Sequence, residues 1–502
     1  MKASETSILS FVGGLDKVFI IPPFQRNYEW TKKQCEDLFH DIEIAFSKGK
    51  THYLGNIVYY IGENSGADFN EYILVDGQQR ITTILLLLCA IRDFDNDSNV
   101  GNTVSRRYLL NDTDDEKFRI RLKQTSYDYQ NFSDVIEGRK IRNENSHIAE
   151  NYAYFLKLLK DTKLSLKDVY NTIQKLEVVG VNLQIDNDLE AVQIIFEKIN
   201  STGRPLSAAD LIRNYLLISS SVQEQEKLYQ SYWVEIEKKI ETDAISKFAR
   251  DYLILKTCDD VGKDFIYQDF KNYFNEYGVL HENILQEMLR YSSFYSWIIH
   301  QDCPDSKLNK SIEELNVLQT GDCYCLYMYL MERLYDDDID ELRKIFNLLS
   351  DYLLRFRIVS VGGSSGALRH VILQLLRKLS NDEVLPKYDD IYFELSNSSS
   401  KSGRFPDNEE FKRALKFSKK SNHRYGKVLL RKIEEFGKKY IAIPLSEITV
   451  EHLMPQTPTR WWEDNFGGKE NTTIIYDNYL NAIGNLAIMS QGGNAANSNK
   501  SL

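Results

Sequence analysis

Two short segments near the C-terminal end combine residue types that can hydrolyse a phosphodiester. Glu451 and His452 are adjacent, Asn485 follows a glycine further on, and Asn494 comes nine residues after Asn485. An acid beside a histidine can supply a metal ligand and a general base at one point, while one later amide holds the imidazole and another closes the metal site. The spacing therefore predicts a one-metal site for phosphodiester cleavage. The alternative is a satisfied core histidine followed by an Asn-rich turn.

A second set of chemical groups lies in the run Asp76-Gly77-Gln78-Gln79-Arg80, between a predicted strand and a predicted helix. Asp-Gly makes a sharp turn, and the residues after it lie at a helix N-terminus, where backbone N–H groups favour an anion. Asp76 can then hold a hydrated Mg²⁺ and Arg80 a phosphate. The alternative is a common turn with a polar surface.

The segment from Gln25 to Trp30 joins an amide and an arginine to aromatic rings. One interpretation is recognition of a phosphate, a nucleotide or a modified DNA backbone by Gln25, Arg26, Tyr28 and Trp30. The other is that the aromatic rings pack the domain.

A third segment, residues 196–213, contains a glycine turn and a helix start. Ser207 with Asp210 three residues later has the spacing of a capping box. Asn200 and Arg204 on the turn can reach a nucleotide. The alternative is a well-capped helix with only its leucines turned inward.

Length and charge limit the protein class. A chain of 502 residues is expected to form two to four domains, and its net charge of −11 argues against a protein that coats DNA indiscriminately. Between Lys401 and Tyr440, however, the chain has thirteen basic residues and five acidic ones, which fits either DNA contact or a solvated helix face.

The six scattered cysteines indicate buried reduced thiols. The absence of a secretory leader or long apolar run predicts a cytoplasmic protein without membrane contact.

Hydrophobic patterns predict an α+β multidomain protein. Short apolar runs indicate strands at 18–21, 56–61 and 72–75, and helical spacing indicates helices at 34–46 and 81–91. The expected domains are an α/β domain at 1–112, a mainly helical body at 113–395, a basic linker at 396–424 and a second α/β domain at 425–502.

The N-terminal motifs, with His52 to Val58 between them, resemble the ParB-like DGQQR domain of the GmrSD family of modification-dependent (type IV) restriction proteins and of the related phosphorothioate-sensing SspE-type proteins. The segment from Phe196 to Arg213 resembles the same family. This resemblance implies that the domain binds and hydrolyses a nucleoside triphosphate (GTP, UTP or another). The residues implied in this site are Asp76, Gly77, Gln78, Gln79, Arg80, Asn200 and Arg204.

The C-terminal segment resembles the HNH (His-Me finger) nuclease domain of the same family, with its ββα-metal fold. The resemblance implies that His452 is the general base, that Glu451 and Asn494 hold Mg²⁺ or Mn²⁺, and that Asn485 orients His452. The sequence continues for only eight residues after Asn494, which predicts a shortened nuclease module.

Together these features predict a nucleotide-regulated, metal-dependent DNA endonuclease of the anti-phage restriction class. The expected partners are double-stranded DNA, modified or from phage, and a nucleoside triphosphate; helical bodies of this kind often pair, so a homodimer is a further expectation. Two alternatives stay open: a nucleotide-dependent DNA sensor whose nuclease module no longer cuts, and a nuclease directed at RNA.

Overall fold

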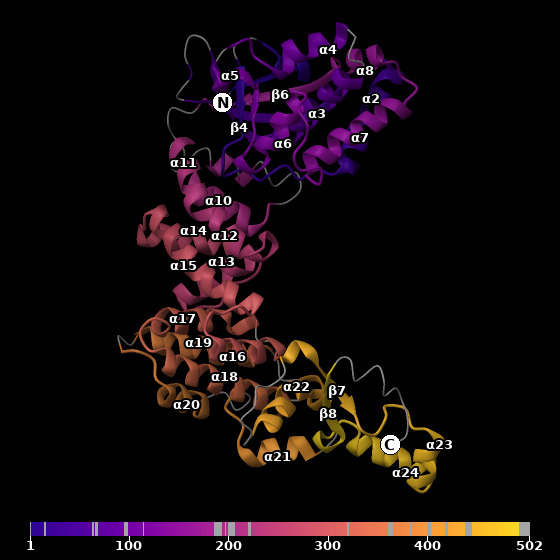
Figure 1. Cartoon of the computed structure of the whole chain (residues 1–502). Coiled ribbons are helices and arrows are strands. Elements are labelled where there is room, and N and C mark those ends of the chain that lie inside the picture. Colours follow the sequence, from indigo (N-terminus) through magenta and orange to yellow (C-terminus); the bar gives the residue numbers. More distant parts are fainter. Residues whose placement is uncertain are drawn as a thin grey trace. The chain divides into compact units, whose positions relative to one another are not determined.

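The computed structural model describes residues 2–14, 17–62, 65, 69–94, 99–113, 115–184, 193–195, 197–198, 206–218, 222–318, 321–359, 365–381, 384–398, 403–416, 420–436 and 444–490. Two compact units divide the chain (Figure 1). The first comprises Met1–Glu235 and Tyr277–Leu285, and the second comprises Ile236–Glu276 and Gln286–Leu502.

A six-stranded mixed sheet forms the centre of the first unit, in the order β1-β6-β3-β4-β2-β5. Parallel pairs join β2 to β4, β2 to β5 and β3 to β6, whereas β1 with β6 and β3 with β4 are antiparallel. The strands are β1 (Lys2–Ser7), β2 (Lys17–Ile20), β3 (His52–Ile61), β4 (Asn70–Asp76), β5 (Leu122–Lys123) and β6 (Leu176–Asn182).

Helices cover this sheet and follow it in the chain. The helix α3 is buried from Ile81 to Ile91, as its continuous apolar run predicts, and it packs against α7. The helices of the first unit are α1 (Ile8–Val12), α2 (Lys32–Lys48), α3 (Gln78–Phe94), α4 (Asn99–Val104), the π-helical turn η1 (Ser105–Leu109), α5 (Glu116–Arg119), α6 (Ser126–Ile136), α7 (His147–Asp161), α8 (Leu166–Ile173), α10 (Ala208–Leu217), α11 (Val222–Leu228) and η3 (Tyr229–Trp233).

Strand alternation divides the buried side chains between the two faces of the sheet. Phe19 and Leu74 join the large core that α2, α3, α7 and α8 complete, while Val18, Ile20 and Ile73 form a small cluster. Successive side chains of a strand point to opposite faces, so this division follows from the period of two. The predicted strands near residues 18, 56 and 72 and the predicted helix at 34–46 are confirmed.

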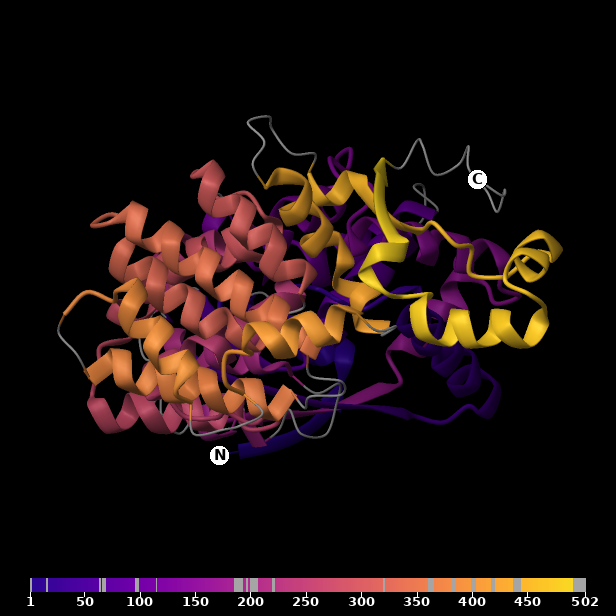
Figure 2. The same ribbon diagram turned by 90° about the horizontal axis from the view of Figure 1, so that it is seen from below.

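The second unit is helical and ends in a two-stranded antiparallel sheet, β7-β8. Helix α18 packs against α16, α17, α20, α21 and α22, and α22 also contacts β7 and β8, which lie beside it in the yellow part of the ribbon (Figure 2). The elements after η3 are α12 (Val234–Lys239), α13 (Thr242–Thr257), α14 (Ile266–Tyr277), α15 (His281–His300), α16 (Ser306–Val317), η4 (Gly321–Cys323), α17 (Tyr324–Leu334), α18 (Ile339–Val359), α19 (Ser365–Asn381), α20 (Tyr388–Ser396), α21 (Asn408–Lys416), α22 (Lys420–Glu435), η5 (Leu445–Glu447), β7 (Ile448–His452), α23 (Arg460–Asn465), α24 (Lys469–Tyr479), η6 (Ile483–Asn485) and β8 (Leu486–Ser490).

These elements differ from the expected domains in two places. The strand β6 lies between β1 and β3, so the N-terminal α/β part continues beyond residue 112. The range 396–424, expected to be a linker, contains the helix α21 and the start of α22.

All six cysteines are buried free thiols, as predicted. No helix in the described ranges has the length and apolar character of a membrane span.

Candidate functional site

The hairpin of β7 and β8 places His452 at the end of a strand. His452 lies opposite Leu486, and Glu451 lies opposite Ala487. Because side chains alternate along a strand, His452 shares a face with Val450 while Glu451 points to the other face. The adjacent acid and histidine therefore present their groups on either side of the strand end.

Helix α22 covers the face that carries His452. A Cβ placed on Gly426 would lie 3.7 Å from both Val450 and Leu486, so the helix packs closely on the hairpin at this glycine. Three residues earlier, the ring of His423 stacks on the ring of His452, with centroids 4.7 Å apart and planes 16° from parallel. The imidazole is thus held between a strand and a helix.

Two amides set the tautomer of His452. Nε2 of the ring lies 2.9 Å from Oδ1 of Asn481, and because an amide oxygen accepts, this contact favours the tautomer with the proton on Nε2. The side-chain nitrogen of Gln456, which can only donate, lies 3.4 Å from Nδ1. Both contacts assign the lone pair to Nδ1, the nitrogen that can take a proton from water.

Asn485 fixes the backbone beside His452. Its Oδ1 accepts a hydrogen bond from the N–H of Met454 at 2.7 Å, and its Nδ2 donates to the carbonyl of Leu480 at 2.7 Å. Its carbonyl also accepts from the N–H of Leu453 at 2.9 Å. The expected role of Asn485, orienting the imidazole, falls in this structure to Asn481 and Gln456, and Asn485 shapes the chain that leaves the strand.

The predicted metal ligands divide between described and undescribed residues. Glu451 is half-buried on β7, and Asn494 lies outside the described residues. In the part of the chain that the structure describes, no group of three or more His, Cys, Asp or Glu side chains is placed to hold a metal ion. Glu451 nevertheless offers carboxylate oxygen, the donor that Mg²⁺ prefers.

Helix α22 is anchored to the helical part of the second unit by buried charges. Arg431 is only 2% exposed and contacts Glu313 at 3.1 Å and Glu314 at 2.9 Å. Lys432 reaches Glu314 at 2.8 Å and Asp351 at 3.0 Å. Burial opposes ionisation of Glu314, but Lys432 and Arg431 hold its pKa below the ordinary value. Two of the thirteen basic residues between Lys401 and Tyr440 therefore anchor α22 to its neighbouring helices.

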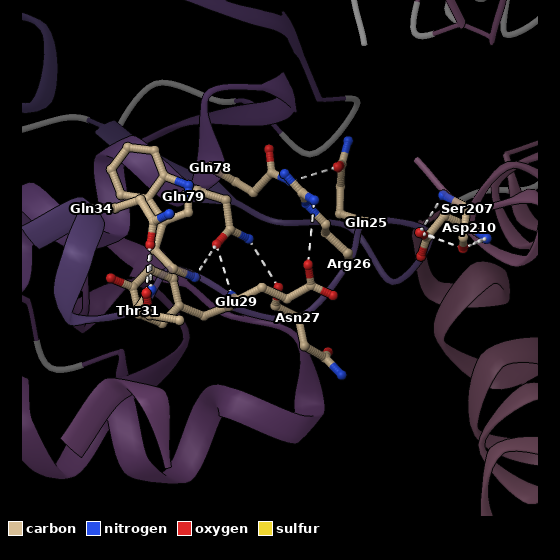
Figure 3. Close-up of polar contacts among 12 residues, drawn as sticks. Gln25, Arg26, Asn27, Glu29, Thr31, Gln34, Gln78, Gln79, Ser207 and Asp210 are labelled. Carbon is tan, nitrogen blue, oxygen red and sulfur yellow. Dashed lines mark hydrogen bonds and ion pairs between the residues drawn. The ribbon is translucent and has the colours of Figure 1, made fainter. Parts of the chain in front are cut away.

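In the first unit, three glutamines join the Asp76 turn to the Gln25–Trp30 segment (Figure 3). Gln25 donates to the carbonyl of Val75 at 2.8 Å, and Gln78 donates to Gln25 at 2.9 Å. The side chain of Gln79 accepts from the N–H of Glu29 at 2.9 Å and donates to the carbonyl of Asn27 at 2.9 Å. All three glutamines are buried, so their amides hold the two motifs together.

Charged groups surround this turn. The pKa of Asp76 lies above its ordinary value, because the effect of burial outweighs the lowering by Arg80, the N–H of Gly77 and Arg26. Arg80 donates to the carbonyl of Asn56 at 2.7 Å, and Arg26 pairs with Glu29 at 3.3 Å. A Cβ on Gly55, whose φ is +112°, would lie 3.0 Å from the Arg80 guanidinium, so glycine allows that close approach. A carboxylate and two guanidinium groups are thus brought together.

The aromatic residues of the Gln25–Trp30 segment mainly pack into the core of the first unit. Tyr28 is buried, its hydroxyl lies 2.6 Å from that of Thr83, and Asn151 donates to it at 3.1 Å. Its N–H donates to Asp128 at 2.6 Å, and burial raises the pKa of Asp128 to about 6. Trp30 is half-buried against the same core. Tyr28 and Trp30 therefore serve mainly as core residues of the first unit.

The third motif reaches the same place through α10. The predicted capping box is confirmed, since Ser207 accepts from the N–H of Asp210 at 3.1 Å and Asp210 accepts from the N–H of Ser207 at 3.1 Å. Arg213, buried on this helix, donates to the carbonyl of Phe24 at 3.4 Å. Asn200 and Arg204 lie outside the described residues.

Comparison with known families gives one match in the N-terminal part of the chain and one in the C-terminal part. Residues 8–217 match the GmrSD restriction endonuclease N-terminal domain, and residues 405–502 match the C-terminal domain of GmrSD restriction endonucleases. The chain belongs to the GmrSD restriction endonuclease family. No curated protein matches it. Membership in this family makes DNA the substrate class.

Within this GmrSD protein, the residues that sequence reasoning missed are those that contact the predicted ones. Asn481, Gln456 and His423 surround His452. Gln456 follows His452 by four residues, but nothing in its surroundings marks it as a partner of the ring. His423 lies on another element, so only the packing of α22 reveals it.

Proposed function

We propose that this protein is a nucleotide-regulated, metal-dependent endonuclease that cuts modified DNA, with His452 as its general base. The observation that carries the proposal is the set of contacts around His452. Nε2–H donates to Asn481 and Nδ1 holds the lone pair. A fixed ring with a single basic nitrogen is the arrangement that general base catalysis requires.

In the proposed step, Nδ1 of His452 takes a proton from water while the water oxygen attacks phosphorus and the bond to the 3′ oxygen breaks. Gln456, an exposed side chain, lies 3.4 Å from Nδ1 and must move aside to admit that water. The imidazolium that forms still donates Nε2–H to Asn481. The amide thereby keeps the ring in place before and after proton transfer.

Glu451 is the described residue that would hold the divalent ion, through its carboxylate, with Asn494 as the second proposed ligand. Mg²⁺ suits such a site because it takes oxygen ligands and keeps several waters. A bound ion would neutralise charge on the scissile phosphate and on the leaving oxygen.

The turn at Asp76 is the proposed nucleoside triphosphate site. Arg80 and Arg26 supply positive charge beside the Asp76 carboxylate, and the α3 N-terminus follows directly. Gln78 and Gln79 would act by holding the turn, since their amides bond to the Gln25–Trp30 segment. Hydrolysis at this site would make cutting depend on the nucleotide state, a switch that suits a potentially toxic nuclease.

The test is cleavage of modified and unmodified phage DNA by the full chain, with Mg²⁺ or Mn²⁺ and with each nucleoside triphosphate in turn. The proposal expects nicking that needs the divalent ion, stops in excess EDTA and changes with nucleotide. Cutting that continues in EDTA would remove the metal from the account. DNA binding without cutting under every condition would favour a sensor, and preferential cutting of RNA would replace the DNA assignment.

A further inference from the structure

A polar cleft of about 1510 Å³ opens at the N-terminal end of strand β2, away from both motifs described above. Its walls come from the end of α1, the glycines after it, α4, the π-helical turn η1 and the segment before β5. Every one of these elements belongs to the first unit. The cleft is larger than the range of about 300–1,000 Å³ typical of small-molecule pockets.

The side chains that line the cleft are strongly biased toward positive charge. Lys17, Arg106, Arg107 and Arg121 line it, and Asp112 is the one acidic residue among its described lining. Arg106 and Arg107 are exposed, and neither has an acidic partner within salt-bridge distance in the part of the chain that the structure describes. In a protein with a net charge of −11, this local excess of cations is a distinct feature.

The geometry of the turn places both exposed arginines at the cleft. The five residues of η1 close with a hydrogen bond from the N–H of Leu110 to the carbonyl of Ser105 at 3.0 Å. A π-helical turn shifts the order of side chains relative to a regular helix, and such turns occur often at functional sites. Here the turn carries two consecutive exposed arginines that both line the cleft.

Arg121 stiffens the cleft from inside. The residue is only 1% exposed. Its guanidinium donates to the carbonyl of Gly14 and, at 3.3 Å, to the carbonyl of Arg106. One acceptor belongs to the glycine turn after α1 and the other to η1, so a single guanidinium joins these two parts of the cleft lining. The buried guanidinium therefore holds the exposed arginines at a fixed separation from the glycine turn, which preorganises the charge.

The cleft is separate from the Asp76 turn. Lys17 pairs with Asn70 at the start of the parallel strands β2 and β4, while Asp76 ends β4 six residues further along. At about 3.3 Å per residue, the two places are roughly 20 Å apart along β4, at opposite ends of that strand. A ligand in the cleft does not occupy the proposed triphosphate site.

We propose that this cleft binds the phosphate backbone of duplex DNA through Arg106 and Arg107, with Lys17 beside them. The inference rests on DNA being the substrate, and it adds a surface of the first unit that binds DNA. Phosphate contacts by arginine supply affinity and position without reading sequence. The size of the cleft favours a polymer over a single nucleotide.

The experiment measures binding of the full chain to a duplex in EDTA across a series of salt concentrations. The variant R106A/R107A removes both exposed arginines, R106K/R107K keeps the charge, and K157A/K160A removes two exposed lysines of α7 outside the cleft as a matched control. We expect R106A/R107A to raise Kd by about 10-fold or more and to lower the slope of log K against log salt by roughly 1–2, since each lost phosphate contact contributes about 0.9.

The K157A/K160A control should change Kd by less than about 2-fold, and R106K/R107K should retain most of the affinity. Circular dichroism and thermal melting identify any variant that fails to fold, in which case R106K/R107K and single alanine variants decide. Unchanged binding by folded R106A/R107A would overturn the proposal, as would no DNA binding by the wild type at low salt. Loss of one bound nucleoside triphosphate per chain in R106A/R107A would make the cleft a nucleotide site instead. Failure of the nuclease assignment is a separate result: DNA cleavage by His452→Ala at the wild-type rate would indicate it.

Discussion

The imidazole rings of His423 and His452 lie face to face, 4.7 Å apart between centroids, and they join α22 to the end of β7. The same helix carries Arg431, which is buried against Glu313 and Glu314 of α16. The ring proposed as general base therefore rests on a helix that is itself fixed to the helical part of the second unit. Displacement of α22 would therefore disturb the position of the ring.

The hydrogen bond from His452 to Asn481 predicts a strong effect of a single amide. Asn481→Ala removes the acceptor that fixes the Nε2–H tautomer, and we expect the rate of plasmid nicking to fall about 10- to 100-fold. Asn478→Ala, an exposed amide on the nearby α24, is the matched control and should cut normally. Equal rates for Asn481→Ala and the control would show that Asn481 does not position the ring.

Stacking by His423 predicts different results for two substitutions. His423→Phe keeps a flat ring against His452, whereas His423→Ala leaves a gap. Since aromatic pairs contribute about 0.5–1.5 kcal/mol, we expect His423→Ala to slow nicking by up to about 10-fold and His423→Phe to lose much less. Single-turnover rates on supercoiled plasmid provide the comparison. If both variants lose activity equally, ring stacking is not what His423 contributes.

Gln79 predicts a stability effect in the first unit. Gln79→Ala removes the hydrogen bonds of a buried amide to the half-buried backbone of Asn27 and Glu29, so we expect the free energy of unfolding to fall by roughly 1–3 kcal/mol. Nucleoside triphosphate hydrolysis should fall as well, because the Asp76 turn loses the hydrogen bonds of Gln79 to the Gln25–Trp30 segment. Gln34→Ala, which alters only an exposed helix cap, is the control. Unchanged hydrolysis and stability in Gln79→Ala would contradict the bracing role.

Asp251 in α13 predicts a pH dependence of stability. Burial raises the pKa of this carboxyl to about 7, against the pull of Lys247 and Arg250. The folded protein therefore holds a proton that the unfolded chain has released, from about pH 4 up to about pH 7, and stability falls as pH rises through that window.

Asp251→Asn removes this titration. Relative to Asp251→Asn, we expect the wild type to lose roughly 1–3 kcal/mol of unfolding free energy between pH 5 and pH 8, measured by urea denaturation. Asp243→Asn, an exposed acid on the same helix, should follow the wild type. A wild-type curve parallel to that of Asp251→Asn would show that Asp251 ionises normally.

Local pattern was enough to predict part of the fold. The apolar run from Ile81 to Ile91 is a buried helix, and Val18 to Ile20 lie in a strand, because periodicity and burial act over a few neighbouring residues. The capping box of Ser207 and Asp210 is equally local. β6 depends on pairing with β1 and β3, which come from distant parts of the chain, and no local signal fixed its place in the sheet.

The site shows the same division. Adjacent Glu451 and His452 on a strand could be read directly, whereas Asn481 meets His452 only because β7 and β8 pair and return the chain to the same point. The charge of Arg431 was visible, but its burial was not, since its partners Glu313 and Glu314 lie on another helix. Tertiary contacts of this kind have no signature in spacing.

The most direct test of the central claim is the single-turnover nicking rate of His452→Ala on a susceptible phage DNA, measured beside Arg80→Ala with Mg²⁺ and nucleotide present. We predict that His452→Ala cuts at least about 100-fold more slowly while it hydrolyses nucleotide at the wild-type rate, and that Arg80→Ala loses hydrolysis. Cutting by folded His452→Ala at the wild-type rate would contradict the account.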